Sequence, residues 1–168
     1  MSLQPRLAYI GLGANLGDLA RTLSLALSAL GDAAQVRLLA VSSAYRSAPI
    51  DAGGPDYLNA VACVETTLSP EALLDCLLAI EQTHGRLRPF VNAPRTLDLD
   101  LLLYGDTQMA SQRLTLPHPR LHQRAFVLLP LLELNADVQA PGLGRLAAFV
   151  PAVADQVLER LAAPLLQP

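Results

Sequence analysis

Residues 94–105, PRTLDLDLLLYG, contain the strand on which the expected fold depends. Residues 96–104 begin with alternating polar residues and leucines and end in an apolar run before Gly105, a pattern typical of a β-strand. Asp98 and Asp100 are two residues apart, so their side chains leave the same face of this strand, with Cα atoms roughly 6.5 to 7 Å apart. The opposite face is apolar and carries Leu97, Leu99 and Leu101.

The segments before this strand predict an alternation of strands and helices. Short apolar runs that contain Val, Thr or Tyr have the composition of strands, and leucines at helical spacing between capping residues predict two helices. The resulting order, β-α-β-β-α-β, indicates an α+β fold in which two helices cover one face of an antiparallel four-stranded sheet. The expected strands are residues 7–12, 36–45, 58–67 and 96–104, and the expected helices are residues 18–30 and 69–85.

The last third of the chain adds elements to this core. We expect a hairpin around residues 107–115, a turn at 117–119, a short helix near 122–132 and a closing helical segment interrupted at Pro151. The chain contains no internal repeat and no low-complexity tract. We therefore expect residues 1–168 to form a single domain.

Composition and charge exclude several classes of protein. With 52% hydrophobic and 16% charged residues, the 168-residue chain is not disordered. All 12 basic residues are arginine, which excludes P-loop NTPases, Schiff-base enzymes and a lysine general base. The net charge of −3 gives no reason to expect nucleic-acid or membrane partners, and the longest run without polar residues is far shorter than the about 18 that a membrane helix needs. No signal-peptide pattern is present, and Cys63 and Cys76 lie in apolar segments as expected for buried free thiols, so we expect a cytoplasmic protein.

Arginines gather around the paired aspartates. Six of the 12 fall within residues 86–124, where the only acids are Asp98, Asp100 and Asp106, which favours an anionic ligand. A pair of carboxylates without a nearby Cys or His suits Mg²⁺, and arginine suits bidentate binding of phosphate. The alternatives are a solvated strand face for the aspartates and a solubilising loop for the arginines. The arginines that flank the strand are Arg86, Arg88 and Arg95.

Glycines near the N-terminus form the pattern GLGANLG, residues 11–17. The spacing is one residue longer than the dinucleotide-binding fingerprint, and antiparallel strands follow, so a Rossmann fold is excluded. We interpret the glycines as a tight strand-to-helix turn with positive φ angles, close enough to contact a ligand. Three further candidates for binding have core packing or a surface turn as their alternative: Tyr57, Phe126 and His118.

Several segments together carry a family resemblance. AYIGLGANLGD, YRSAPID, PDYLNAV, EQTHGRLR, APRTLDLDLLLYG and RLTLPHPRLHQRAFVLLPL, in this order, closely resemble 6-hydroxymethyl-7,8-dihydropterin pyrophosphokinases. The resemblance covers residues 8–137, and PRTLDLDLLLYG is its most specific part. It implies a ferredoxin-like fold with added C-terminal elements and an enzyme of folate biosynthesis. Such an enzyme transfers diphosphate from ATP to the hydroxymethyl group of the pterin and releases AMP.

The resemblance also implies roles for individual residues. Asp98 and Asp100 would bind two Mg²⁺ ions and, with Arg86 and Arg95, form the catalytic set. The residues that match ATP-binding positions are Glu81, Arg86, Arg88, Arg95, Arg113, Thr115 and His118. The residues that match pterin-binding positions are Ser47, Ala48, Ile50, Tyr57, Asn59 and Phe126, of which Tyr57 and Phe126 would sandwich the ring.

The resemblance leads us to expect two lid loops, and the second of them differs from the family at two positions. We expect residues 46–56 and 86–94 to be lids that close over the substrates. In the second loop, Asn92 stands where many relatives have tryptophan, so a stacking contact would be lost or taken over by Phe90. Pro89 stands where some relatives have lysine, so one phosphate contact would be absent.

We expect a monomer that takes ATP and the pterin, with no nucleic-acid or membrane partner. The main alternative is a non-catalytic, ferredoxin-like nucleotide-binding module. An RNA-binding domain of similar topology would need stacking aromatics on its central strands, and those strands offer Leu, Val and Ala instead.

Overall fold

The computed structural model describes residues 4–15, 18–48, 56–84, 97–162 and 165. The first strand and helix are β1 (Arg6–Ala14) and α1 (Leu19–Asp32), and the second pair of strands is β2 (Val36–Val41) and β3 (Tyr45–Ser47). The remaining elements are β4 (Tyr57–Thr66), α2 (Pro70–His84), β5 (Asp98–Tyr104), β6 (Met109–Ala110), β7 (Thr115–Leu116), α3 (Ala125–Leu134), β8 (Gln139–Ala140), β9 (Gly144–Arg145), a 3₁₀ helix η1 (Leu146–Val153) and β10 (Leu158–Arg160).

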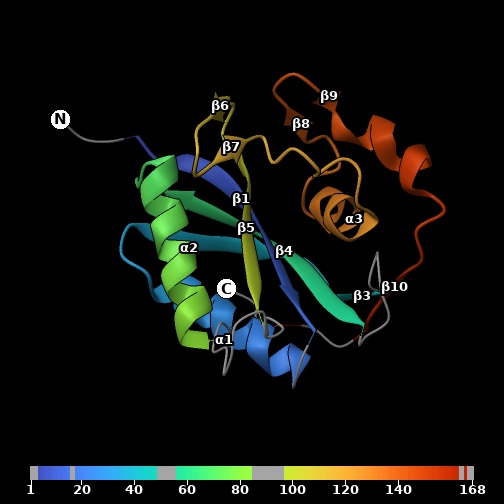
Figure 1. Cartoon of the computed structure of the whole chain (residues 1–168), viewed down its shortest axis with the longest axis horizontal. Helices are drawn as coiled ribbons and strands as arrows, with labels where there is room; N and C mark the ends of the chain where they lie inside the picture. Colours follow the sequence, from blue (N-terminus) through green and yellow to red (C-terminus); the bar gives the residue numbers. More distant parts are fainter. Residues whose placement is uncertain (1–3, 16–17, 49–55, 85–96, 163–164, 166–168) are drawn as a thin grey trace.

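One antiparallel sheet organises the fold (Figure 1). Its strands follow the order β10-β3-β4-β1-β5, and β2 pairs with β4 beyond the end of β3. Helices α1 and α2 lie on one side of this sheet and α3 on the other. The expected α+β, ferredoxin-like order of strands and helices is confirmed, with β6 and β7 as the expected hairpin.

The single strand expected over residues 36–45 is wrong, because the chain bends between β2 and β3. At the bend, the Ser42 N–H donates to the Val61 carbonyl at 2.9 Å, and the Ser42 Oγ accepts from the Val61 N–H at 2.9 Å. The side chain therefore replaces one ladder bond, a local alternative that serine offers to the backbone. The bend lets β3 pair with the first residues of β4, beside the candidate site.

Three smaller boundaries also differ from the sequence-based expectation. Helix α1 continues through Gly31, and α3 begins at Ala125 rather than near residue 122. The closing helical segment is the 3₁₀ helix η1, which contains Pro151.

Cys63 is buried as expected, whereas Cys76 is only half-buried, and burial raises the pKa of both thiols.

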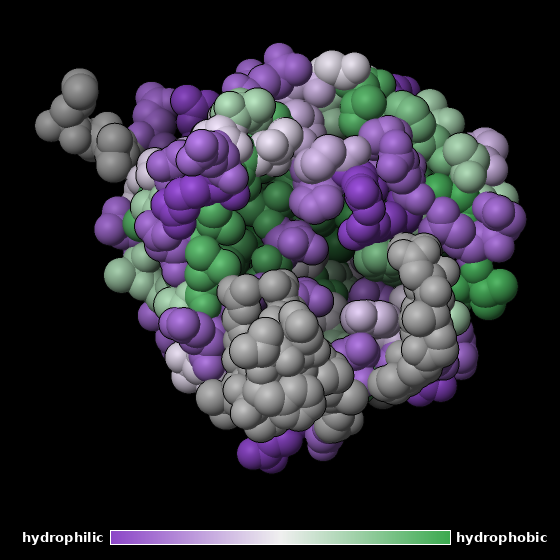
Figure 2. All heavy atoms as spheres, viewed as in Figure 1, coloured by the Kyte–Doolittle hydropathy of each residue, from purple (hydrophilic) through white to green (hydrophobic). Residues whose placement is uncertain are grey.

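The sheet has two unlike faces. The inner face packs against α1 and α2 mainly through apolar side chains, and Ile10 of β1 and Leu23 of α1 are completely buried there. Burying a side chain of this size contributes about 1.5 to 3 kcal/mol. The outer face packs against α3 and η1 through residues such as Val61, Leu102 and Leu128. Figure 2 shows apolar residues recessed near the middle of the side viewed in Figure 1, with polar residues around them.

Within the described part of the chain, no helix is both long and apolar enough to cross a membrane.

Candidate active site

A row of outer-face residues crosses three strands at one end of the sheet. Gly13 of β1 pairs with Asn59 of β4 on one side and with Asp98 of β5 on the other. One step along the strands, Gly11 pairs with Val61 and Asp100 in the same way. Because directly opposed residues project to the same face, the Asn59 amide and both carboxylates lie on the outer face. Asp98 is half-buried and Asp100 is exposed.

The two glycines form the floor between the amide and the carboxylates. A Cβ at Gly13 would lie 3.2 Å from the Asn59 Oδ1, and a Cβ at Gly11 would lie 3.5 Å from the Leu102 side chain. The expectation of a turn with positive φ angles is wrong at these two positions, because both glycines belong to β1 and neither has a positive φ. Because Gly11 and Gly13 have no side chain, a ligand can approach the backbone of β1 closely. Gly17 lies outside the described residues.

Asn59 is held in one orientation by strand β3. Its Nδ2 donates to the Ser47 Oγ at 2.7 Å and more weakly to the Tyr45 carbonyl at 3.5 Å, and the side chain is buried. The Oδ1 is then directed over Gly13, where it can accept a hydrogen bond from a ligand. Tyr57 pairs with Ser47 and is half-buried. Ala48, which follows Ser47 in the chain, is exposed.

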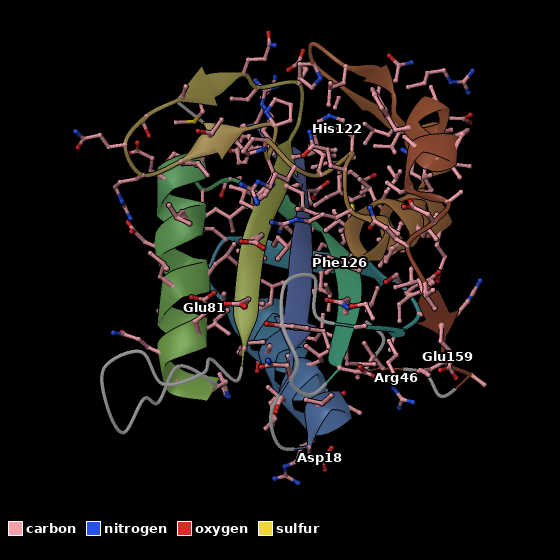
Figure 3. The ribbon with its side chains drawn as sticks, turned by 45° about the vertical axis from the view of Figure 1, so that its right-hand side comes forward. Asp18, Arg46, Glu81, His122, Phe126 and Glu159 are labelled. Atoms are coloured by element: carbon pink, nitrogen blue, oxygen red, sulfur yellow. The ribbon has the colours of Figure 1, made fainter. Side chains whose placement is uncertain are left out.

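Phe126 reaches the same face from the first turn of α3 and is half-buried. The guanidinium carbon of Arg124 lies 5.6 Å from its ring centroid, a cation–π distance. Figure 3 shows Phe126 on the α3 side of the sheet and Glu81 between α2 and β5. Sequence reasoning did not assign Arg124 to the site, because a spacing of two residues at a helix start does not predict that the side chains meet.

Glu81 fixes the backbone between the two aspartates. It is 3% exposed, and its Oε2 accepts a hydrogen bond from the Leu99 N–H at 2.7 Å. Among the described strands, β5 pairs with β1 alone, so β5 is an edge strand and the Leu99 N–H lies on its open side. Glu81 therefore acts on the site indirectly, by holding the strand that carries Asp98 and Asp100. This role does not depend on whether Glu81 also contacts a nucleotide.

His118 lies close enough to Asp100 for the aspartate charge to act on it. Burial lowers the pKa of His118 below 6.5, the Asp100 charge opposes this shift, and Arg124 and Arg120 reinforce it. The Nδ1 accepts a hydrogen bond from the Arg120 N–H at 3.1 Å. The neutral ring at pH 7 then carries its hydrogen on Nε2 and can donate it.

Other expected site residues are less directly placed. Arg113, just before β7, forms an exposed ion pair with Asp75 of α2, and Thr115 is exposed in β7. Exposed pairs of this kind contribute about 1 kcal/mol or less, so Arg113 can exchange its partner. The residues that lie outside the described part of the chain are Ile50, Arg86, Arg88 and Arg95, together with Pro89, Phe90, Asn92 and most of both expected lids.

The aspartate pair fits a hard divalent cation that takes most of its ligands from elsewhere. Within the described ranges, no group of three or more His, Cys, Asp or Glu side chains is arranged to hold a metal ion. Mg²⁺ commonly uses one or two carboxylates and completes its octahedron with water and substrate phosphates. Two carboxylates beside a glycine floor leave room for such ligands.

Comparisons with known proteins agree with this geometry. Residues 9–136 match the family model of 7,8-dihydro-6-hydroxymethylpterin-pyrophosphokinase. The chain is 43% identical over 155 residues to a 2-amino-4-hydroxy-6-hydroxymethyldihydropteridine pyrophosphokinase of Haemophilus influenzae, covering 92% of this chain and 97% of that protein. It is 41% identical to the enzyme of the same name from Pseudomonas aeruginosa, covering 91% and 95% of the two chains.

A similar fold occurs in a solved structure. The crystal structure of a Plasmodium falciparum HPPK-DHPS triple mutant superposes with a TM-score of 0.71 at 13% identity, covering 92% of this chain. Our chain spans 46% of that longer protein, so the likeness concerns the fold of one part. The family model and the two relatives show the family, and the solved structure agrees in fold: this chain belongs to the 7,8-dihydro-6-hydroxymethylpterin-pyrophosphokinase family.

Proposed function

We propose that the outer face of the sheet transfers the terminal diphosphate of ATP to 6-hydroxymethyl-7,8-dihydropterin. The products are AMP and the pterin diphosphate, an intermediate of folate biosynthesis. The observation that carries this proposal is the row in which an anchored amide, a glycine floor and two carboxylates follow one another across β4, β1 and β5. Family membership supports the reaction, and the row supports its location.

The pterin occupies the half of the row beside β3 and α3. Asn59 accepts a hydrogen bond from the edge of the ring, because its amide hydrogens are already engaged by Ser47 and the Tyr45 backbone. Tyr57 and Phe126 stack on the two ring faces, a favourable arrangement for a flat heterocycle. The backbone of Ser47, Ala48 and Ile50 completes the pocket.

The nucleotide occupies the half beside β5. Asp98 and Asp100 would hold two Mg²⁺ ions, which when bound supply charge neutralisation for the triphosphate. His118 donates its Nε2 hydrogen to a phosphate oxygen, and Glu81 keeps β5 in place. The residues proposed to bind ATP through positive charge or hydrogen bonds are Arg86, Arg88, Arg95, Arg113 and Thr115.

The chain contributes chiefly by positioning the reactants and stabilising charge. The pterin hydroxymethyl oxygen attacks the β-phosphorus of ATP and loses its proton. The bond between the β-phosphorus and the oxygen that bridges to the α-phosphate breaks, and AMP leaves with that oxygen. Arg86 and Arg95 stabilise the charge on the transferred group, and a preorganised interaction of this kind is worth about 3 kcal/mol.

The remaining parts of the proposal concern the protein as a whole. We propose that residues 1–168 act as one domain, as a monomer in the cytoplasm, without nucleic-acid or membrane partners. The alternative function, a non-catalytic nucleotide-binding module, does not need a paired carboxylate beside an anchored amide.

The test is to resolve the nucleotide products formed from Mg·ATP with and without 6-hydroxymethyl-7,8-dihydropterin. We expect AMP and a pterin diphosphate in equal amounts, formed only when the pterin is present. ADP as the product, or no turnover, would reject the proposal.

A further inference from the structure

Glu133, in the last turn of α3, is the centre of a polar network that the reaction itself does not use. The Tyr45 hydroxyl donates to its Oε1 at 2.5 Å, and the Ser43 N–H donates to its Oε2 at 2.8 Å. Arg160 of β10 lies 3.6 Å from the same Oε2 and donates from Nε to the Ser43 Oγ at 3.0 Å. The Glu133 side chain is only 21% exposed, so these contacts are partly shielded from water.

This network connects the two walls of the proposed pterin pocket. Phe126 and Glu133 are seven residues apart on α3, which places them on the same side of the helix, two turns from each other. Tyr45 is paired with Asn59 in the sheet, and its carbonyl accepts from the Asn59 amide. A continuous path therefore runs from the aromatic wall to the hydrogen-bonding wall through one tyrosine–carboxylate contact.

The residues Gln156–Arg160, which we call the C-terminal brace, hold α3 at both ends. At its start, the Gln156 Oε1 accepts from the Ala125 N–H at 2.8 Å, and its Nε2 donates to the Gln123 carbonyl at 2.9 Å. At its end, Arg160 pairs with Glu133. Between these two contacts, β10 pairs with β3, so that Leu158 lies opposite Ser47.

We propose that Glu133, Tyr45 and the C-terminal brace are positioning residues that set the spacing between Phe126 and Asn59 and so determine affinity for the pterin. The inference rests on the proposed function, since it assumes that the ring binds between these two side chains. The described contacts of the network lie on β3, β10 and α3 rather than on β5, so we expect the nucleotide half to be unaffected. This asymmetry separates positioning of one ligand from general stabilisation of the fold.

The test compares Tyr45→Phe and Glu133→Gln with the wild-type protein. The readouts are the Kd of 6-hydroxymethyl-7,8-dihydropterin, followed by pterin fluorescence in a chain that contains no tryptophan, and the Kd of Mg·ATP. We expect both variants to weaken pterin binding about tenfold, as loss of a charge-assisted hydrogen bond would, and to change the Kd of Mg·ATP less than twofold. Because the two side chains share one contact, the double variant should be no weaker than the worse single variant.

Two matched variants act as controls. Tyr104→Phe removes a tyrosine hydroxyl that donates to the Leu68 carbonyl on the inner face. Asp137→Asn removes the carboxylate of an exposed ion pair with Arg145. Neither should alter the Kd of either ligand, even where Tyr104→Phe lowers the melting temperature.

Unchanged pterin affinity in Tyr45→Phe would overturn the inference, and this isosteric variant keeps the test open if Glu133→Gln fails to fold. Equal weakening of both ligands, or an equal effect of Tyr104→Phe, would also overturn it, because either result indicates a purely structural role. Failure of the proposed function is distinguishable, since it would appear as absence of pterin-dependent AMP from the wild-type protein.

Discussion

The inner and outer faces of the sheet are built from the same strands and have opposite character. On β1, Ile10 and Leu12 face α1 and α2, while Gly11 and Gly13 face outward. On β5, Leu99 faces inward between two outward aspartates. Strand periodicity alone separates the two sets, because successive side chains alternate between faces.

The difference assigns stability to one face and chemistry to the other. The inner face is mostly apolar where it meets α1 and α2, and its buried Thr66 side chain donates to the Gln35 carbonyl, so this face can be packed closely. The outer face has glycines where side chains would fill the site, and a polar group, Asn59, that is held by hydrogen bonds to β3. Substitutions on the two faces should therefore have separable effects.

The largest expected effect is on turnover. Asp98→Asn or Asp100→Asn should lower kcat by about 10³-fold or more, because each removes a charge from the proposed metal site. The melting temperature should change little, since neither carboxylate belongs to the core. Steady-state kinetics with AMP detection measures the loss.

Asp106→Asn is the matched control for these variants. Asp106 is exposed in the turn after β5, so its loss should leave turnover unchanged. Near-normal kcat in either Asp98→Asn or Asp100→Asn would contradict the assignment of metal binding to this face.

Ile10→Ala should have the opposite signature. Ile10 is fully buried against α1 and α2, and a truncation of this kind costs about 2 to 5 kcal/mol of unfolding free energy. Urea denaturation measures this loss. At a temperature where the variant is folded, its kcat should stay near that of the wild type, and a large fall in kcat would show that the faces are not separable.

Gly13→Ala probes the floor itself. The new Cβ would lie 3.2 Å from the Asn59 Oδ1, and Asn59 cannot easily move because Ser47 holds it. We expect the KM for the pterin to rise about tenfold, the scale of one disturbed hydrogen bond, with little change in the KM for ATP.

Gly31→Ala is the matched glycine on the other side of the sheet. Gly31 lies in α1, and a Cβ there would be 3.8 Å from the Leu38 side chain, an ordinary contact distance. We therefore expect a gain in stability of up to about 1 kcal/mol and unchanged kinetics. An unaltered pterin KM in Gly13→Ala would show that the floor does not contact the ring.

The smallest effect concerns alkaline pH. Burial and the neighbouring Glu133 raise the pKa of Tyr45 from 10.0 to about 12. The folded state then binds this proton more tightly than the unfolded state, so the associated stability is complete below pH 10 and is lost as the pH rises towards 12. As the pH rises over this range, the unfolding free energy of Tyr45→Phe should fall less steeply than that of the wild-type protein. Urea denaturation at several pH values measures both slopes. Parallel slopes in the two proteins would contradict the shift.

Sequence alone predicted the inner face well and the outer face in part. Alternation in β5 placed Asp98 and Asp100 together and the leucines opposite, because a period of two depends only on local geometry. It could not show that Gly13 lies between Asn59 and Asp98, since that depends on pairing between strands far apart in the chain. The Ser42 bend and the buried Glu81 contact were missed for the same reason: each depends on a partner distant in sequence. Arg86, Arg88, Arg95 and Ile50 keep the roles proposed from the family resemblance.

The most direct test of the central claim is an amide and side-chain NMR titration of the wild-type protein with the pterin and a non-hydrolysable Mg·ATP analogue. The claim is that both ligands bind on the outer face. It predicts that the Gly11 and Gly13 amides and the Asn59 side-chain amide shift strongly, while the amides of buried helical residues such as Leu23 in α1 and Leu73 in α2 shift little. Strong shifts confined to α1 and α2, with the two glycines and Asn59 unmoved, would contradict it.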